Sequence, residues 1–226
     1  MTHPRATLAL LAIQDDRLKV LIQKTSEGTV RLLSGSGEPE LDRDLAFTCR
    51  RLSRDLIGNL DYQMLPINTF SNTASSGGFD VHQVWAGLAR PDEIPTELPE
   101  GTLFVDLEPL LSKYALDGSE WECPFELEMD HVHALGLTSF ILKEFAGRSK
   151  YPAFLVPREF TMAELIRAYE ILAGQPIDQA SFRRKIETVN FLQEVGERRG
   201  TSRRPAKTYQ MIGVELTLRK FLTMQD

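Results

Sequence analysis

Apolar residues in the first 150 positions follow strand and helix periods in turn, which predicts a mixed α/β domain. Residues 6–13 (ATLALLAI) are an unbroken apolar run of strand length, and residues 18–23 (LKVLIQ) alternate like a hairpin partner. Residues 41–56 repeat apolar side chains at a helical period, and Asp42 or Asp44 would cap that helix. The same reasoning predicts strands at 63–70, 81–89 and 103–107 and helices at 107–114 and 130–145.

The last third of the chain has a different pattern, with two helices followed by a basic hairpin. The tetrapeptide Gly147–Lys150 is the most linker-like stretch, so we expect one domain over residues 1–147 and another over 151–226. Two helices joined by a short turn, and then a hairpin, are typical of a winged helix-turn-helix. The elements predicted here are an extended piece at 151–156, helices at 161–172, 178–189 and 214–224, strands at 191–195 and 207–212, and a basic turn at 196–204.

Charge is distributed unevenly between these two parts. The net charge of the 226 residues is −6, which taken alone argues against nucleic-acid binding. However, residues 178–226 carry ten Lys and Arg against six Asp and Glu, which leaves residues 1–177 strongly acidic. This asymmetry is typical of a basic DNA-binding module on an acidic body.

The remaining composition favours a soluble, cytoplasmic protein without a metal centre. No apolar run reaches transmembrane length, and residues 1–15 lack the features of a signal peptide. Cys49 and Cys123 have no CxxC spacing, so neither a zinc site nor a disulfide framework is indicated. His131 and His133 are two apart and would point to different sides of a helix, which makes them poor ligand candidates.

The helix at 178–189 has the pattern of a recognition helix. Phe182, Ile186 and Val189 recur at i, i+4 and i+7 and would pack inward, which leaves polar and basic side chains on the other faces. The hairpin turn adds basic residues with Gly, Ser and Thr, which permit close approach to a phosphate backbone. The candidate DNA contacts are Ser181, Arg183, Arg184, Lys185 and Thr188 on the helix and Arg198, Arg199, Thr201, Ser202, Arg203, Arg204 and Lys207 on the wing. The alternative is a solvated basic hairpin that contacts an acidic protein.

Residues 36–58 resemble the Nudix box, G-x5-E-x7-R-E-U-x-E-E-x-G-U, in register but not in chemistry. Ser36 takes the place of the opening Gly, Asp42 that of the first Glu, and Arg50 that of the Arg. The three metal-binding Glu positions are Arg51, Arg54 and Asp55, which share one helix face. A guanidinium has no acceptor and would repel Mg²⁺, but it binds diphosphates through bidentate hydrogen bonds.

Such a face would bind a nucleotide diphosphate without cleaving it. Two alternatives remain open. In the first, Arg51 and Arg54 lie on a solvated face and pair with Asp42, Asp44 or Asp55. An unusual metal site built from Glu38, Glu40, Asp42 and Asp55 would instead make the protein a hydrolase.

Together the two parts resemble the Nudix-related transcriptional regulators of the NrtR type. The matching C-terminal residues are Phe160, Glu164, Leu165, Tyr169, Glu170, Phe182, Arg183, Arg184, Lys185, Gly196, Arg198, Arg204, Pro205, Ala206 and Tyr209. The resemblance implies an α+β protein with an N-terminal Nudix-like α/β/α sandwich on a mixed sheet and a C-terminal winged helix-turn-helix. It also implies a homodimeric repressor of NAD-metabolism genes on a palindromic DNA operator, which ADP-ribose or a related nucleotide releases. Some relatives answer to a sugar.

Effector contacts are inferred from the fold that this resemblance implies. The candidates are Lys24, Arg31, Arg51 and Arg54 for phosphate and Phe79 for stacking on a base. Trp85 is a second stacking candidate, although we expect it to be a core strand residue. No cofactor is expected besides the effector, and the altered box argues against an enzyme.

Overall fold

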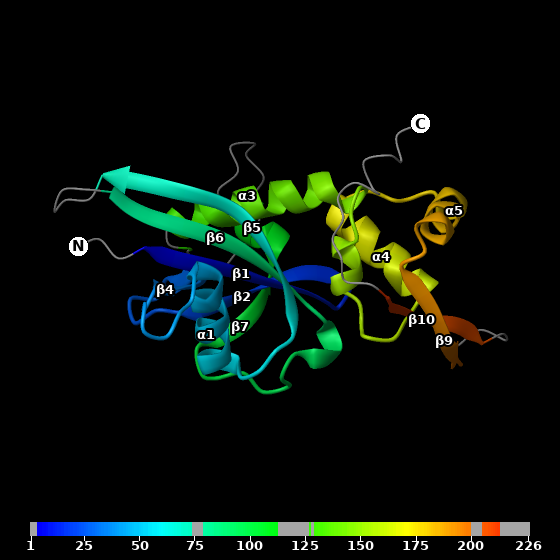
Figure 1. Cartoon of the computed structure of the whole chain (residues 1–226), viewed down its shortest axis with the longest axis horizontal. Coiled ribbons are helices and arrows are strands. Elements are labelled where there is room, and N and C mark those ends of the chain that lie inside the picture. Colours follow the sequence, from blue (N-terminus) through cyan, green and yellow to red (C-terminus); the bar gives the residue numbers. More distant parts are fainter. Residues whose placement is uncertain (1–3, 74–78, 113–126, 128, 200–204, 213–226) are drawn as a thin grey trace.

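The computed structural model describes residues 4–73, 79–112, 127, 129–199 and 205–212. A twisted sheet flanked by helices forms the N-terminal part, and a small helical unit with a β-hairpin forms the C-terminal part (Figure 1). The N-terminal elements are β1 (Arg5–Gln14), β2 (Arg17–Lys24), β3 (Val30–Arg31), β4 (Leu33–Ser36), α1 (Leu45–Ile57), β5 (Tyr62–Thr73), β6 (Phe79–Ala89), η1 (Pro91–Glu93), β7 (Thr102–Asp106), α2 (Leu107–Ser112) and α3 (Met129–Ala146). The C-terminal elements are η2 (Tyr151–Phe154), β8 (Phe160–Thr161), α4 (Met162–Ala173), α5 (Gln179–Val189), β9 (Leu192–Arg198) and β10 (Ala206–Met211).

The large sheet is mixed, as expected. Its order is β3-β2-β1-β6-β5, with β4 also paired to β1 and β7 to β2. Strands β1 and β6 run parallel in the centre, from Arg5 opposite His82 to Leu11 opposite Leu88. The other pairs of this sheet in the described residues are antiparallel.

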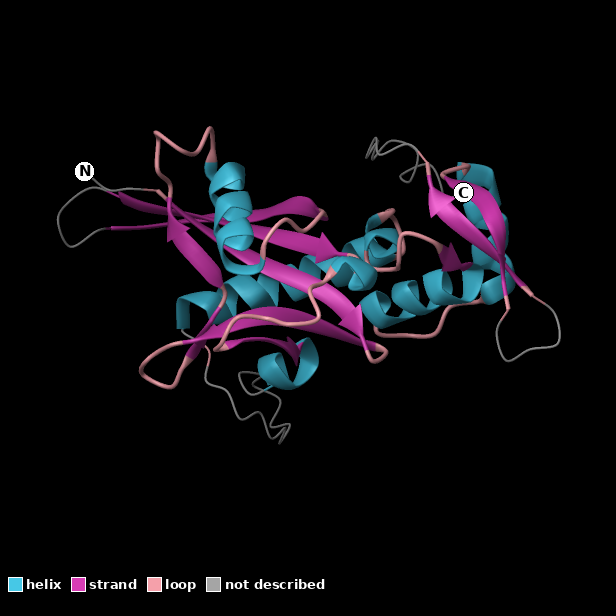
Figure 2. Ribbon diagram, turned by 90° about the horizontal axis from the view of Figure 1, so that it is seen from below, coloured by secondary structure: helices cyan, strands magenta, loops and turns pink. Residues whose placement is uncertain are grey.

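Strand β1 is buried on both faces, which explains its unbroken apolar run. Leu8 and Leu10 pack in one cluster with Cys49 of α1, whereas Leu11 packs in a second cluster with Leu135 of α3. Because side chains alternate across a strand, α1 and α3 cover opposite faces of the sheet. The predicted α/β/α sandwich is confirmed (Figure 2).

Helix α1 begins four residues later than the periodicity predicted. Asp44 caps it by accepting a hydrogen bond from the Phe47 amide at 3.0 Å. Leu41, which was expected to be its first apolar position, is 64 % exposed. It lies in a turn closed by the Glu38 carbonyl, which accepts from the Leu41 amide at 2.8 Å. The helix ends at Gly58, whose φ of +80° favours glycine.

The C-terminal unit has the predicted helices and hairpin. Thr161 and Glu164 form a capping box at the start of α4, and Asp178 caps α5 through the Ser181 amide. The small sheet has the order β8-β10-β9. Residues 196–198 belong to strand β9 rather than to the predicted turn, because they pair with β10. The expected helix at 214–224 lies outside the described residues.

The segment after the expected linker is helical rather than extended. Residues 151–154 form the 3-10 turn η2, with Pro152 near its start, where a missing amide proton costs nothing. Ser149 within the predicted linker is buried, and its carbonyl accepts a hydrogen bond from the Tyr169 hydroxyl at 2.7 Å. The expected linker is therefore anchored to α4.

Arg90, at the end of β6, joins the two parts. One of its amino groups donates to the carbonyls of Val156 and Pro157 at 3.0 and 3.2 Å. Burial lowers the pKa of Arg90, and its partners here are carbonyl dipoles. Ile13 and Met211 also pack against the cores of both parts.

Candidate functional site

Helix α5 presents a basic surface to solvent. Its inner face is held by Phe182 and Ile186, both buried as predicted. The outward side chains of Arg183, Arg184 and Lys185 are exposed. This is the arrangement by which a recognition helix places cations against phosphates and base edges.

Two of the small polar candidates on α5 already have local partners. The Ser181 hydroxyl accepts from Arg184 Nη2 at 3.2 Å, and the Thr188 hydroxyl donates to the Lys185 carbonyl at 2.7 Å. Asp178 at the N-cap accepts from the Ser181 amide, which holds the pKa of that carboxyl below its ordinary value. The start of the helix is therefore fixed before any DNA contact is made.

The base of the wing is braced by ion pairs. Arg198 donates to Glu164 Oε1 at 2.9 Å and to the Glu159 carbonyl at 2.6 Å, so it ties the hairpin to the start of α4. Lys207 lies 2.8 Å from Glu194 on the neighbouring strand, and this contact raises the pKa of Lys207. Sequence reasoning treated both cations as DNA contacts, but each has an acidic partner within its own domain.

The rest of the predicted wing is only partly described. Arg199 is exposed at the end of the described part of the hairpin. Thr201, Ser202, Arg203 and Arg204 lie outside the described residues.

The altered Nudix face is organised around a buried ion pair. Arg51 binds Asp42 through two hydrogen bonds of 2.9 Å, from Nε to Oδ1 and from Nη2 to Oδ2. Its third nitrogen, Nη1, lies 3.0 Å from Glu38 Oε1. The side chains of Arg51 and Asp42 are only 13 % and 3 % exposed. The Arg51 guanidinium holds the pKa of Asp42 well below its ordinary value. Arg51 thus follows the pairing alternative rather than standing free for a phosphate.

These residues do not fit a divalent metal. Asp42 stands at the first acidic position of the box, and both of its oxygens accept hydrogen bonds from Arg51. Mg²⁺ needs several oxygen ligands in octahedral geometry, and a guanidinium supplies none. Among the described residues, no three His, Cys, Asp or Glu side chains gather as a metal site would require.

Arg54 occupies a different environment from Arg51. It is exposed, lies 3.8 Å from Asp55, and lines a shallow pocket of about 410 Å³ at the end of α1. Arg50 lines the same pocket, with its guanidinium 5.3 Å from the centre of the Tyr62 ring. Arg50 was not among the effector contacts expected from the sequence. Its alignment with the Arg of the Nudix box could have identified it as one.

The other effector candidates are scattered. Lys24 and Arg31 lie on the β2–β3 pair, whereas Phe79 begins β6 on the far side of β1. Arg31 is exposed, and the side chain of Phe79 lies outside the described part. Trp85 packs partly buried beside the α1-side core, which agrees with its expected structural role.

Cys49 and His131 are core residues. Burial raises the pKa of the Cys49 thiol to about 12, so this cysteine is not a nucleophile at neutral pH. His131 is buried on α3, and its ring centre lies 6.4 Å from that of His82.

Comparison with known proteins assigns the C-terminal unit. Residues 152–211 match the family described as NrtR DNA-binding winged helix domain. This part of the chain is similar to an NrtR winged helix domain. Its match begins within η2 and ends with β10, so it contains the basic helix and the braced wing.

Relatives extend the similarity to the whole fold. The ADPR responsive transcriptional repressor NtrR of Acinetobacter baylyi is 28 % identical over 97 residues, which are 41 % of this chain and 39 % of that protein. The structure of Shewanella oneidensis NrtR complexed with a 27mer DNA has a TM-score of 0.80 at 22 % identity, over 92 % of this chain and 93 % of that one. A MutT/nudix family protein from Enterococcus faecalis gives 0.69 at 14 % identity, over 94 % and 89 % of the two chains.

These comparisons confirm the predicted resemblance to NrtR-type regulators and the predicted fold. At such low identity the structural matches show the fold alone. The match to the curated relative covers less than half of its length. In the described part of the chain, no helix is long and apolar enough to span a membrane.

Proposed function

We propose that this protein is a DNA-binding transcriptional repressor whose Nudix-like domain senses ADP-ribose or a related nucleotide. The observation that carries the proposal is the NrtR winged helix domain with an exposed basic helix, joined to a Nudix-like domain. Regulated genes of NAD metabolism, cytoplasmic location and a homodimer on a palindromic operator are parts of the same proposal. A dimer would place two α5 helices on two half-sites of the operator.

We propose main and secondary DNA contacts according to the exposure and ion pairing of each side chain. Arg183, Arg184 and Lys185 are exposed on α5 and supply the main contacts with phosphates and bases. Arg198 and Lys207 act first as braces of the wing, because both are ion-paired within the domain. Ser181, Thr188, Arg199 and the four wing residues 201–204 complete the proposed surface.

We propose that the Nudix-like domain binds its effector without hydrolysing it. The ion pair of Arg51 with Asp42 takes the position where hydrolases of this fold hold a metal, and its side chains are only 13 % and 3 % exposed. The phosphates of the effector are then bound by exposed cations, of which Arg54 and its neighbour Arg50 are the leading pair. Lys24 and Arg31, which lie on β2 and β3 away from α1, are secondary candidates for the phosphates, and Phe79 on β6 is the candidate for stacking on the base.

The direct test is DNA titration in the presence of ADP-ribose. The full-length protein should bind a palindromic promoter fragment of its own genome, with an affinity that falls steeply with salt. ADP-ribose should weaken this binding, and an Arg50→Ala, Arg54→Ala variant should keep DNA affinity but lose the response. Release of products from ADP-ribose in Mg²⁺ or Mn²⁺ would instead favour a hydrolase. Release of DNA by a sugar rather than by ADP-ribose would change the proposed effector and leave the proposed repressor unchanged.

A further inference from the structure

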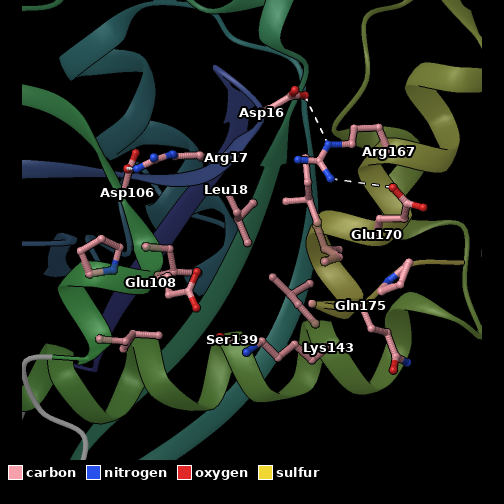
Figure 3. Close-up of a pocket in the computed structure, with 18 residues that line it drawn as sticks. Asp16, Arg17, Leu18, Asp106, Glu108, Ser139, Lys143, Arg167, Glu170 and Gln175 are labelled. Atoms are coloured by element: carbon pink, nitrogen blue, oxygen red, sulfur yellow. Dashed lines mark hydrogen bonds and ion pairs between the residues drawn. The ribbon is translucent and has the colours of Figure 1, made fainter. Parts of the chain in front are cut away.

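A cleft lies between the two domains, where the β1–β2 turn, α2 and α3 meet α4. Its volume is about 740 Å³, within the range of small-molecule sites, which often lie at domain interfaces. The Nudix-like domain lines it with the β1–β2 turn, the start of α2 and one face of α3. The NrtR domain lines it with the second half of α4 and the turn that follows (Figure 3).

The body of the cleft is apolar. Leu142 of α3 and Leu172 of α4 are almost fully buried behind it, while Leu18 and Ile171 are partly exposed within it. A ring or a branched chain could be sheltered from water against these four side chains. Each square ångström of apolar surface removed from water contributes about 25 cal/mol, so such a wall supplies affinity without fixing orientation.

Most of the charges around the cleft already have partners. Arg17 bonds Asp106 at 2.5 Å. Arg167 lies 3.5 Å from Asp16 and 3.8 Å from Glu170, so its contact with Asp16 spans the two domains. Figure 3 shows these pairs on the upper side of the cleft.

Lys143 is the exception among the cations that line the cleft. In the part of the chain that the structure describes, this side chain has no ion pair and no hydrogen bond. It lies on the same face of α3 as Ser139, and Gln175 lines the cleft from the turn after α4 (Figure 3). An ammonium and a hydroxyl on one helix face beside an apolar wall form a site for an oxyanion.

The cleft also adjoins the DNA-reading helix. Gln175 and Pro176 belong to the turn between α4 and α5, and Glu170 Oε1 accepts from the Ile177 amide at 3.2 Å. The next residue, Asp178, is the N-cap of α5. A molecule held between α3 and this turn would therefore bias both the angle between the domains and the start of the recognition helix.

We propose that this cleft is a second ligand site, for a small organic anion with an apolar body. Its carboxylate or phosphate binds Lys143 and Ser139, and its body packs against the leucines. The site is separate from the α1 region, because α1 and α3 cover opposite faces of the sheet. Binding in the cleft stands on its own, whereas its effect on DNA rests on the proposed function.

The test begins with binding of simple probes to the full-length protein. Benzoate and phenyl phosphate carry the two anionic groups, and benzamide is the neutral counterpart of benzoate. Both anions should bind about ten- to a hundredfold more tightly than benzamide, as expected for a charge-assisted hydrogen bond. The stronger of the two anions identifies the preferred group. Absence of binding by either anion, or equal binding of benzamide, would overturn the assignment.

Three variants locate the binding. Lys143→Met should remove the preference for anions, and Ser139→Phe should fill the cleft and abolish binding of all three probes. Arg148→Gln is the matched control, because it removes an exposed cation just beyond α3 and should change nothing. Unaltered anion binding in Lys143→Met would overturn the proposal even if Ser139→Phe failed to fold.

A DNA titration with saturating benzoate then tests the coupling. A changed affinity that Lys143→Met abolishes supports it, and an unchanged affinity refutes it. The probe titrations use no DNA. They therefore test binding in the cleft even if the protein proves not to bind DNA.

Discussion

Replacement of Asp42 by Asn should destabilise the Nudix-like domain far more than a surface charge change would. Asp42 accepts two hydrogen bonds from Arg51 and one each from the Glu38 amide and the Thr48 hydroxyl. Removing one partner of a buried pair typically costs about 3–5 kcal/mol. Arg51 keeps Glu38 at 3.0 Å in the variant, so we expect a loss of about 2–4 kcal/mol.

Thermal and denaturant unfolding measure this loss. Both tryptophans, Trp85 and Trp121, precede residue 147, so their fluorescence follows the N-terminal domain. For a domain of this size the midpoint should fall by about 5–15 °C. The matched control is Asp55→Asn, which breaks the exposed contact with Arg54 and should cost less than about 1 kcal/mol. Equal effects of the two substitutions would refute the view that the Asp42 pair is structural.

The pH dependence of this difference provides an independent check. Arg51 lowers the pKa of Asp42 in the folded protein, so the stabilisation is fully present above the ordinary Asp value of 3.8. It is lost as the pH falls below that value toward the folded pKa. The stability gap between the natural protein and Asp42→Asn should therefore be constant near neutral pH and narrow below about pH 4. A gap that does not narrow in acid would contradict the assigned ion pair.

Three further variants probe the DNA surface and the domain junction. Arg183→Ala with Arg184→Ala should weaken DNA binding and reduce the slope of log affinity against log salt by about 1–2, measured by anisotropy; an unchanged slope would exclude both from phosphate contact. Arg90→Met should leave the carbonyls of Val156 and Pro157 without their donor and speed limited proteolysis near residue 156. An unchanged cleavage rate would show that these hydrogen bonds are dispensable. Tyr169→Phe removes the hydroxyl that bonds Ser149 and should cost about 1–2 kcal/mol in chemical unfolding, and no loss would mean that water replaces the bond.

Hydrophobic patterning was sufficient for most of the fold because the buried faces are regular. The apolar run of β1, the capping box of α4, the N-cap of α5 and the helical periods of both helices lead to the observed elements. The errors fell where local hydrogen bonds override periodicity. Leu41 continues the helical period of α1, yet the cap at Asp44 excludes it.

The site was predictable only in outline, because ion pairing depends on distant residues. The positions of Arg51 and Arg54 in the box suggested equal roles, but Asp42 binds only Arg51. Likewise, Arg198 and Lys207 are cations of the kind that contact DNA, but they form ion pairs with Glu164 and Glu194. The cleft between the domains could not be inferred from the sequence, since its walls come from segments more than a hundred residues apart.

The most direct test of the central claim is a salt-controlled titration of the full-length protein with palindromic promoter fragments, with and without ADP-ribose. We predict sequence-preferring binding that weakens steeply with salt and that ADP-ribose reverses. Binding without any preference over random DNA at moderate salt would contradict a regulator. Specific binding that ADP-ribose leaves unchanged would contradict the proposed effector.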